Sequence, residues 1–107
     1  TGNGWRKLMR SKHHFNYIIE TLPHPQPLFK LIQEHSGLSD REMYSRYNMG
    51  AGFAVFVPQQ SVKDVLKICK DEKIGALDVG YIENGRRSVS IKPLKIVFSD
   101  NDLKVKE

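Results

Sequence analysis

Apolar side chains recur along the chain at two spacings, and each spacing predicts one kind of element. A period of three to four residues predicts helices over residues 4–10, 27–35 and 40–47, and a further helix that begins after Ser61, which we expect to be its N-cap. The apolar stripe of that last helix consists of Val62, Val65, Leu66 and Cys69. Runs rich in aromatic and β-branched residues predict strands over residues 15–20, 53–57, 74–82 and 88–91.

Capping and turn residues mark the ends of these elements. Pro27 suits the first turn of a helix and Gly37 suits its end. Ser39 followed by Glu42 has the spacing of a capping box. The Asn-Gly pair within residues 83–86 predicts a tight hairpin between the last two strands. The order of elements predicts an α+β fold in which helices pack on one face of a mixed β-sheet.

The length of 107 residues indicates one domain, which we assign to residues 1–98, followed by a polar tail over residues 99–107. No apolar run approaches the roughly 20 residues that cross a bilayer, so we expect no membrane span. The single cysteine, Cys69, excludes an internal disulfide framework and indicates a cytoplasmic protein in which this thiol is buried. Because the chain begins with Thr1 and not with Met, we expect it to be part of a longer product.

The net charge of +5 suggests an anionic partner. Lysines and arginines are spread along the whole chain, however, and cluster locally only at Arg6, Lys7, Arg10 and Lys12. This distribution favours a small anion over a nucleic acid. The four histidines have no cysteine or paired carboxylate at ligand spacing, so we expect no metal site.

A glycine-containing loop at the start of the chain is the first candidate binding element. Gly2, Asn3 and Gly4 lead into a basic helix, where free N–H groups and the positive helix end suit a phosphate and Arg6 adds charge. The same residues are also typical of an ordinary capped turn. Asn at the middle position tolerates left-handed backbone, which would preserve the turn.

A second turn, ahead of the predicted strand 53–57, contains Gly50 and Gly52. Glycines at such a position favour close packing against a neighbouring strand over direct contact with a ligand. For Asn48 we expect a hydrogen bond to the backbone of the turn. Trp5 and Tyr44 occupy apolar positions of their helices, which indicates core anchors.

No catalytic residue can be identified. Asp40, Glu42 and Asp78 are available for acid–base chemistry, but the capping box already accounts for Glu42. No combination of nucleophile, base and orienting group is visible.

Three stretches together resemble the C-terminal domain of the aminoimidazole ribonucleotide synthetase family, the phosphoribosylformylglycinamidine cyclo-ligases. The stretches are Pro27-Leu28-Phe29-Lys30-Leu31-Ile32-Gln33, Glu42-Met43-Tyr44 and Tyr47-Asn48-Met49-Gly50-Ala51-Gly52. Thr1-Gly2-Asn3-Gly4 stands in the place of that family's Thr-Gly-Gly-Gly loop. The similarity continues through residues 55–58, 62–69 and 77–82, and so covers most of the chain.

The resemblance implies an ATP-dependent ring closure in purine biosynthesis. In that reaction the amide oxygen of formylglycinamidine ribonucleotide is activated by phosphoryl transfer, an internal amine attacks the activated carbon, and phosphate leaves. ATP and Mg²⁺ are implied to bind mainly to an N-terminal domain that this chain lacks, and that domain also builds a dimer. The chain alone is therefore expected to be inactive and to bind neither cofactor.

The resemblance also implies roles for individual residues. Thr1, Gly2, Asn3, Gly4 and Arg6 are implied to bind the phosphate of a phosphorylated ribonucleotide substrate. The turn residues that shape the cleft are implied to be Asn48, Gly50 and Gly52. Since the first half of the family's C-terminal domain is also missing, we expect self-association or a partner fragment to cover the exposed apolar surface.

Three departures from the family pattern keep two alternatives open. Asn3 replaces a glycine, the segment between Gly4 and Pro27 is shortened and lacks the usual Ile-Pro-Arg, and Ala51-Gly52-Phe53 replaces Ile-Gly-Met. One alternative is a non-catalytic assembly or regulatory module with the same fold. The other is a relative that acts on a different ATP-activated phosphorylated substrate.

Overall fold

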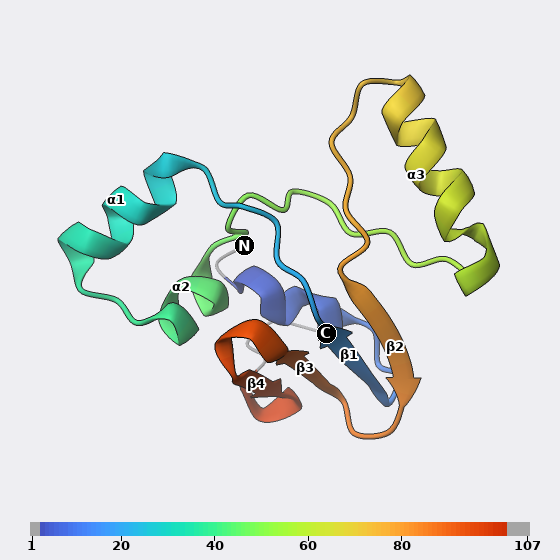
Figure 1. Cartoon of the computed structure of the whole chain (residues 1–107). Coiled ribbons are helices and arrows are strands. Elements are labelled where there is room, and N and C mark those ends of the chain that lie inside the picture. Colours follow the sequence, from blue (N-terminus) through green and yellow to red (C-terminus); the bar gives the residue numbers. More distant parts are fainter. Residues whose placement is uncertain (1–2, 103–107) are drawn as a thin grey trace.

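The computed structural model describes residues 3–102, and its strands form one mixed four-stranded sheet in the order β2-β1-β3-β4 (Figure 1). The strands are β1 (Phe15–Ile19), β2 (Gly80–Asn84), β3 (Ser88–Ile91) and β4 (Ile96–Ser99). β1 is antiparallel to β2 and parallel to β3, and β3 is antiparallel to β4. The predicted α+β class with a mixed sheet is confirmed.

Three α-helices and a leading 3₁₀ helix accompany the sheet. They are η1 (Gly4–Arg10), α1 (Pro27–Ser36), α2 (Asp40–Arg46) and α3 (Val62–Asp71), and three short 3₁₀ turns cover Gln59–Ser61, Lys92–Leu94 and Asp100–Asp102. The local end signals were predicted correctly, since Pro27 begins α1 and Gly37 ends it with a left-handed φ of 71°. Both hydrogen bonds of the Ser39–Glu42 capping box are present. Within residues 3–102, no helix has the length and apolar character needed to cross a bilayer.

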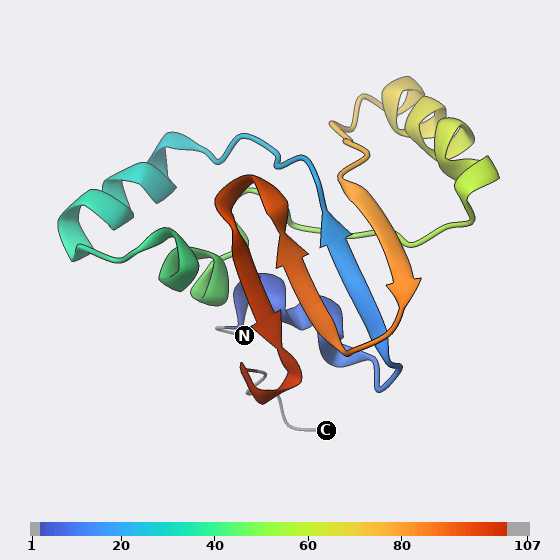
Figure 2. The same ribbon diagram turned by 60° about the horizontal axis from the view of Figure 1, so that its bottom comes forward.

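The core lies between one face of the sheet and the pair η1 and α2 (Figure 2). Alternate strand residues point into it, as the two-residue period of a strand requires. The sheet contributes Tyr17, Ile19, Val89, Ile91, Ile96 and Phe98. From the helical side, Trp5 and Tyr44 pack edge to face with ring centroids 5.4 Å apart. Both rings are buried, which confirms them as core anchors.

The predicted strand over residues 53–57 is wrong. The segment has no regular secondary structure and crosses the core face of the sheet as an irregular connection. Phe53 is 90% exposed and Val55 is 60% exposed. A strand needs a neighbouring strand to receive its backbone hydrogen bonds, and within residues 3–102 no strand pairs with this segment.

The predicted hairpin between the last two strands is also wrong. β2 and β3 do not pair, because β1 lies between them and hydrogen-bonds to both. The turn after Asn84 therefore spans the width of β1, and the Gly85 N–H donates to the His14 carbonyl oxygen at 3.0 Å. The predicted strand 74–82 is shorter than expected at its start, since β2 begins only at Gly80.

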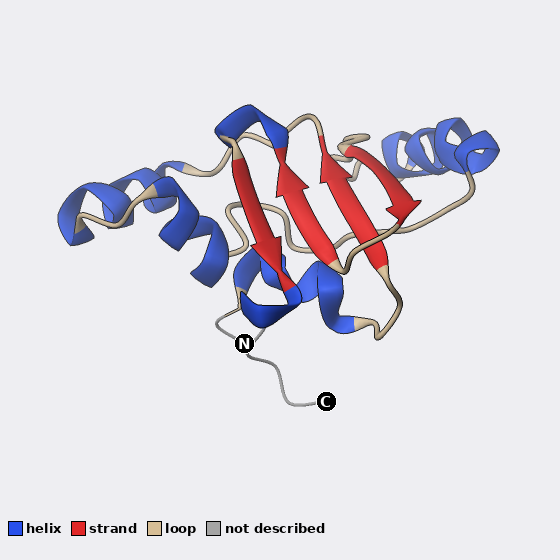
Figure 3. Ribbon diagram, turned by 90° about the horizontal axis from the view of Figure 1, so that it is seen from below, coloured by secondary structure: helices blue, strands red, loops and turns tan. Residues whose placement is uncertain are grey.

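Helix α3 forms where its apolar stripe predicted it, but none of its residues is buried. Figure 3 shows it beyond the β2 edge of the sheet, apart from the helical layer that contains η1. The Ser61 side chain makes no capping hydrogen bond, contrary to expectation. Cys69 is half-buried, whereas the sequence predicted a buried thiol.

The folded part extends past the predicted boundary at residue 98. β4 ends at Ser99, and a 3₁₀ turn follows over Asp100–Asp102. The remainder of the predicted tail, residues 103–107, lies outside the described residues, as do Thr1 and Gly2.

Candidate functional site

The start of η1 packs directly against the last turn of α2, and this junction contains the described part of the glycine loop. Gly4 has a left-handed φ of 49°, and a Cβ there would overlap the Tyr44 carbonyl oxygen and lie 2.9 Å from the Arg46 nitrogen. Asn3 is buried with a right-handed backbone (φ −104°, ψ −4°). Of the loop residues that the structure describes, Gly4 is the left-handed one, and the expected left-handed tolerance of Asn3 is not used.

Arg6 connects three segments at this junction from a buried position. Its guanidinium donates to the Ser45 carbonyl oxygen from Nη2 at 2.7 Å and from Nε at 3.1 Å. Further bonds reach the Asn3 carbonyl oxygen at 3.3 Å and the Asp102 carbonyl oxygen at 2.6 Å. A cation at the carboxyl end of α2 also interacts favourably with the helix dipole. The guanidinium thus holds η1, α2 and the C-terminal turn together.

The second candidate turn meets the first through Trp5. The indole Nε1–H donates to the Asn48 carbonyl oxygen at 2.9 Å. The Asn48 Oδ1 in turn accepts from the Gly50 N–H at 2.9 Å, so its predicted bond to the turn backbone is confirmed. The structure therefore brings Asn3, Gly4, Arg6, Asn48 and Gly50 to one junction.

The two glycines of that turn differ. Gly50 has a left-handed φ of 91°, and a Cβ there would lie 2.7 Å from the Gln26 Oε1 and 3.4 Å from the Pro25 Cα. The sequence predicted that Gly50 packs against a strand. Its close neighbour is instead the proline-rich connection before α1. Gly52 has no atom within 4 Å of its added Cβ and is exposed, so the predicted close packing is absent there.

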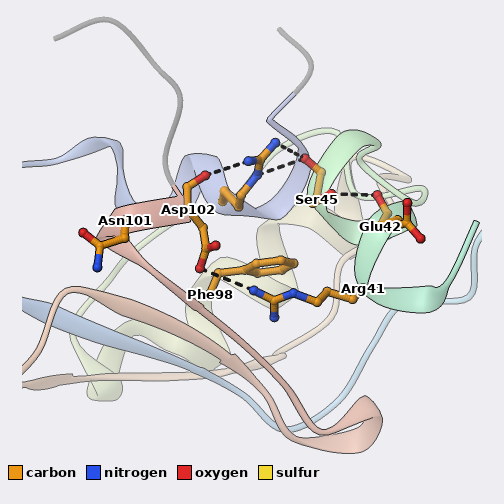
Figure 4. A pocket seen from close by; sticks show the side chains of 7 residues that line it. Arg41, Glu42, Ser45, Phe98, Asn101 and Asp102 are labelled. Carbon is orange, nitrogen blue, oxygen red and sulfur yellow. Dashed lines mark hydrogen bonds and ion pairs between the residues drawn. The ribbon is translucent and has the colours of Figure 1, made fainter.

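Next to Arg6, a pocket of about 200 Å³ lies between α2 and the end of β4 (Figure 4). The Arg41 guanidinium lies over the Phe98 ring, 4.6 Å from its centroid. Arg41 also donates to the Val97 carbonyl oxygen at 2.7 Å and pairs with the Asp102 carboxylate at 3.4 Å. The lining residues are Arg6, Arg41, Glu42, Ser45, Phe98, Asn101 and Asp102.

Sequence reasoning missed Asp102, which had been placed in the polar tail. Its Oδ2 accepts from the Ser99 N–H at 2.8 Å and from the Ser99 hydroxyl at 3.3 Å. A serine followed three residues later by an aspartate is a local turn signal that would have identified this arrangement. Asp102 therefore links the end of β4 to both arginines of the pocket.

Both carboxylates of the pocket are held in the ionised form. The Ser99 N–H is the main cause that lowers the pKa of Asp102, and the Arg41 charge lowers it further. Hydrogen bonds from Ser39 lower the pKa of Glu42. Ionised carboxylates and guanidinium groups suit charge pairing and positioning better than proton transfer near neutral pH.

The remaining acid–base and metal candidates do not converge on this site. Asp40 accepts a hydrogen bond from Gln33 Nε2 at 2.9 Å, and Asp78 lies exposed on the segment before β2. Glu42 does line the pocket, but its carboxylate is engaged in the capping box. Over residues 3–102, no three histidine, cysteine or carboxylate side chains lie together in a way that fits a metal ion.

Comparisons with known proteins agree with this architecture. The family described as AIR synthase related protein, C-terminal domain, matches residues 9–92. A phosphoribosylformylglycinamidine cyclo-ligase from Methanococcus vannielii is 39% identical over 84 residues, which is 78% of this chain and 24% of the relative.

Two further relatives carry the same protein name. The protein from Methanocaldococcus jannaschii is 37% identical over 97 residues, which is 91% of this chain and 27% of the relative. The protein from Caldicellulosiruptor bescii is 38% identical over 65 residues, or 61% of this chain and 19% of the relative. The chain thus spans about a quarter of the length of the curated relatives it matches.

Proposed function

Because the chain belongs to the family of AIR synthase related C-terminal domains, we propose that it is the C-terminal part of an ATP-dependent cyclo-ligase of purine biosynthesis. The reaction we assign to the complete enzyme is the conversion of formylglycinamidine ribonucleotide to aminoimidazole ribonucleotide. The name shared by relatives at 37–39% identity over most of this chain supports that assignment. We place the complete enzyme in the cytoplasm.

The observation that carries the proposal is the built junction between the two glycine turns. Gly4 permits the close approach of η1 to α2, and the Trp5 indole ties the loop to Asn48. Two sequence stretches that resemble the cyclo-ligases are thereby held in one place. We propose that the loop Thr1, Gly2, Asn3 and Gly4 binds the phosphate of the ribonucleotide, and that Asn48, Gly50 and Gly52 shape the adjoining wall.

Arg6 has a supporting role in this proposal. Its hydrogen bonds go to main-chain carbonyl oxygens on three segments, so it fixes the position of the loop while adding positive charge beside it. A phosphate near the loop would gain from that charge, because a buried guanidinium is screened less than an exposed one. We therefore assign direct contact with the phosphate to the backbone of the loop. Arg6 contributes charge from a buried position next to the loop.

ATP and Mg²⁺ are proposed to bind outside this chain. Mg²⁺ is usually bound by one or two carboxylates together with the phosphates of a nucleotide. Because the family resemblance implies an N-terminal domain that carries this site, we place both there, and we expect this chain alone to have no cyclo-ligase activity.

The test uses the complete enzyme with formylglycinamidine ribonucleotide and ATP. We expect phosphate release that is coupled to ring closure, and Asn3→Asp is expected to raise the KM for the ribonucleotide by about tenfold because a carboxylate repels the phosphate. The control substitution Asn84→Asp, at the exposed far end of β2, adds the same charge away from the loop and is expected to leave that KM unchanged. Absence of coupled phosphate release from the folded enzyme would refute the assigned reaction.

A second candidate function is favoured by the contacts of Arg6. A guanidinium that donates to carbonyl oxygens of three segments is also what a purely structural module requires. In a non-catalytic assembly or regulatory module, the complete protein would bind neither the ribonucleotide nor ATP. Calorimetric titration with each ligand therefore separates the two candidates.

A further inference from the structure

Arg87 holds the carboxyl end of η1 from a distant part of the chain. It lies one residue before β3, at the spacing that continues the core face of that strand through Val89 and Ile91. Its Nε donates to the Met9 carbonyl oxygen at 2.8 Å, and its Nη2 donates to the carbonyl oxygens of Met9 and Arg10. The side chain thus joins two segments that are 78 positions apart.

These bonds meet a need that is specific to the end of a helix. The last carbonyl groups of a helix have no partner within it, and a cation beside them also interacts favourably with the helix dipole. The Met9 side chain is fully buried at the same end, but apolar packing has no preferred direction. Arg87 therefore supplies a directional contact at the carboxyl end of η1.

The opposite end of the same helix carries the described part of the glycine loop. There Gly4 permits the close approach to α2, and Arg6 donates to the Ser45 carbonyl oxygen. The Trp5 indole bonds to the Asn48 carbonyl oxygen. Seven residues of 3₁₀ helix span only roughly 14 Å. An arginine thus holds each end of a short helix, and a shift of one end is transmitted to the other.

The surroundings of Arg87 differ from those of its neighbour. Arg87 is half-buried, whereas Arg86 is exposed. Burial raises the pKa of Tyr17, and the Arg87 charge lowers it by a smaller amount, which places the guanidinium near this buried ring. A partly buried charge is screened less by salt than an exposed one. Arg86 therefore provides a comparison in which the same charge has a solvated position.

We propose that Arg87 is a positioning residue for the glycine loop: it fixes the carboxyl end of η1, so that Asn3 and Gly4 at the other end stand where the substrate phosphate binds. The inference rests on the proposed function, because that function assigns the loop to the phosphate. Arg87 acts through η1 and does not touch the substrate. Its loss therefore weakens the binding of the ribonucleotide and leaves the chemical step intact.

Steady-state kinetics of the complete enzyme test this role. Arg87→Ala is expected to raise the KM for the ribonucleotide about fivefold, because a loosened loop binds ground state and transition state equally less well. The kcat and the KM for ATP should stay within about twofold of the wild type. Arg87→Lys keeps an ammonium donor and should raise the KM for the ribonucleotide only about twofold.

Arg86→Ala is the matched control, since it removes the same charge from the adjacent exposed position. We expect it to leave the KM for the ribonucleotide unchanged. Equal effects of Arg86→Ala and Arg87→Ala, or a comparable change in kcat or in the KM for ATP, would overturn the proposal.

A second measurement does not depend on the reaction. Trp5 is the single tryptophan of the 107-residue chain and lies on η1, four residues before Met9. In the folded chain, Arg87→Ala should raise the acrylamide quenching constant of Trp5 at least about twofold, and Arg86→Ala should not change it. Equal quenching in the two variants would show that Arg87 does not position η1. A folded wild-type enzyme without coupled phosphate release would instead refute the proposed function.

Discussion

The close approach of η1 to α2 at Gly4 makes a quantitative prediction for Gly4→Ala. The alanine Cβ would overlap the Tyr44 carbonyl oxygen and lie 2.9 Å from the Arg46 nitrogen. Both are main-chain atoms of a helix, so no side chain can rotate away. The left-handed φ of 49° adds a backbone penalty of its own.

Two contributions determine the magnitude. A left-handed alanine costs roughly 1–2 kcal/mol, partly offset by the lower entropy of its unfolded chain. Overpacking against rigid atoms adds about 1–3 kcal/mol. We expect Gly4→Ala to lower the free energy of unfolding by about 2–4 kcal/mol.

Gly37→Ala is the matched control, because it separates the two contributions. Gly37 is also left-handed, with φ of 71°, but no atom lies within 4 Å of its added Cβ. Gly37→Ala should therefore lower the free energy of unfolding by only about 1 kcal/mol.

Urea denaturation followed by tryptophan fluorescence provides the assay. Trp5 is the single tryptophan and lies buried beside the junction, so its emission reports on the contact directly. If both variants lose the same stability within about 0.5 kcal/mol, the close approach at Gly4 contributes nothing and the reasoning is refuted.

Three further predictions use the same junction. Arg6→Lys should lower the free energy of unfolding, measured by urea denaturation, by about 2–3 kcal/mol, because one ammonium group cannot span the three carbonyl oxygens that the guanidinium reaches. A decrease below about 0.5 kcal/mol would contradict this role. The pKa of Asp102 is lowered in the folded state, chiefly by the Ser99 N–H, so its stabilisation is present above the unfolded pKa near 4 and is lost as pH falls through the folded value. Asp102→Asn should therefore weaken the acid dependence of the unfolding midpoint below about pH 4, and an unchanged profile would argue against it. Asn48→Ala should lower the free energy of unfolding by about 1 kcal/mol, because it removes the acceptor of the Gly50 N–H. Asn48→Asp keeps an acceptor and should lower it less in the same denaturation measurement.

Local signals in the sequence predicted local structure well. The Ser39–Glu42 capping box and the Gly37 helix end involve residues within four positions of each other, so their geometry needs no distant partner. The same holds for the bond from the Gly50 N–H to the Asn48 side chain.

Strand pairing could not be predicted in the same way, because it depends on segments far apart in the chain. The Asn84–Gly85 pair has the composition of a hairpin turn, yet β1 occupies the place between β2 and β3. The run over residues 53–57 has strand composition without a strand beside it.

In the candidate site, too, local features were predicted from the sequence and contacts between distant segments were not. The sequence identified Asn3, Gly4, Asn48 and Gly50 separately as turn residues. Their meeting through the Trp5 indole is a contact across 43 positions, which no local pattern encodes. Arg6 was expected to face a ligand, but burial against three carbonyl oxygens is visible only in three dimensions.

The position of β1 in the sheet has a consequence for synthesis on the ribosome. Asn16 of β1 bonds to Glu83 and to Ser88, which lie 67 and 72 residues later in the chain. The interior strand β1 therefore leaves the ribosome before either of its neighbours exists, and the sheet can close only after residues 80–91 have been synthesised. Contacts of such large sequence separation slow folding and prolong the exposure of unpaired strand edges. During that interval the side chains of Tyr17 and Ile19, which are buried in the folded sheet, stay exposed.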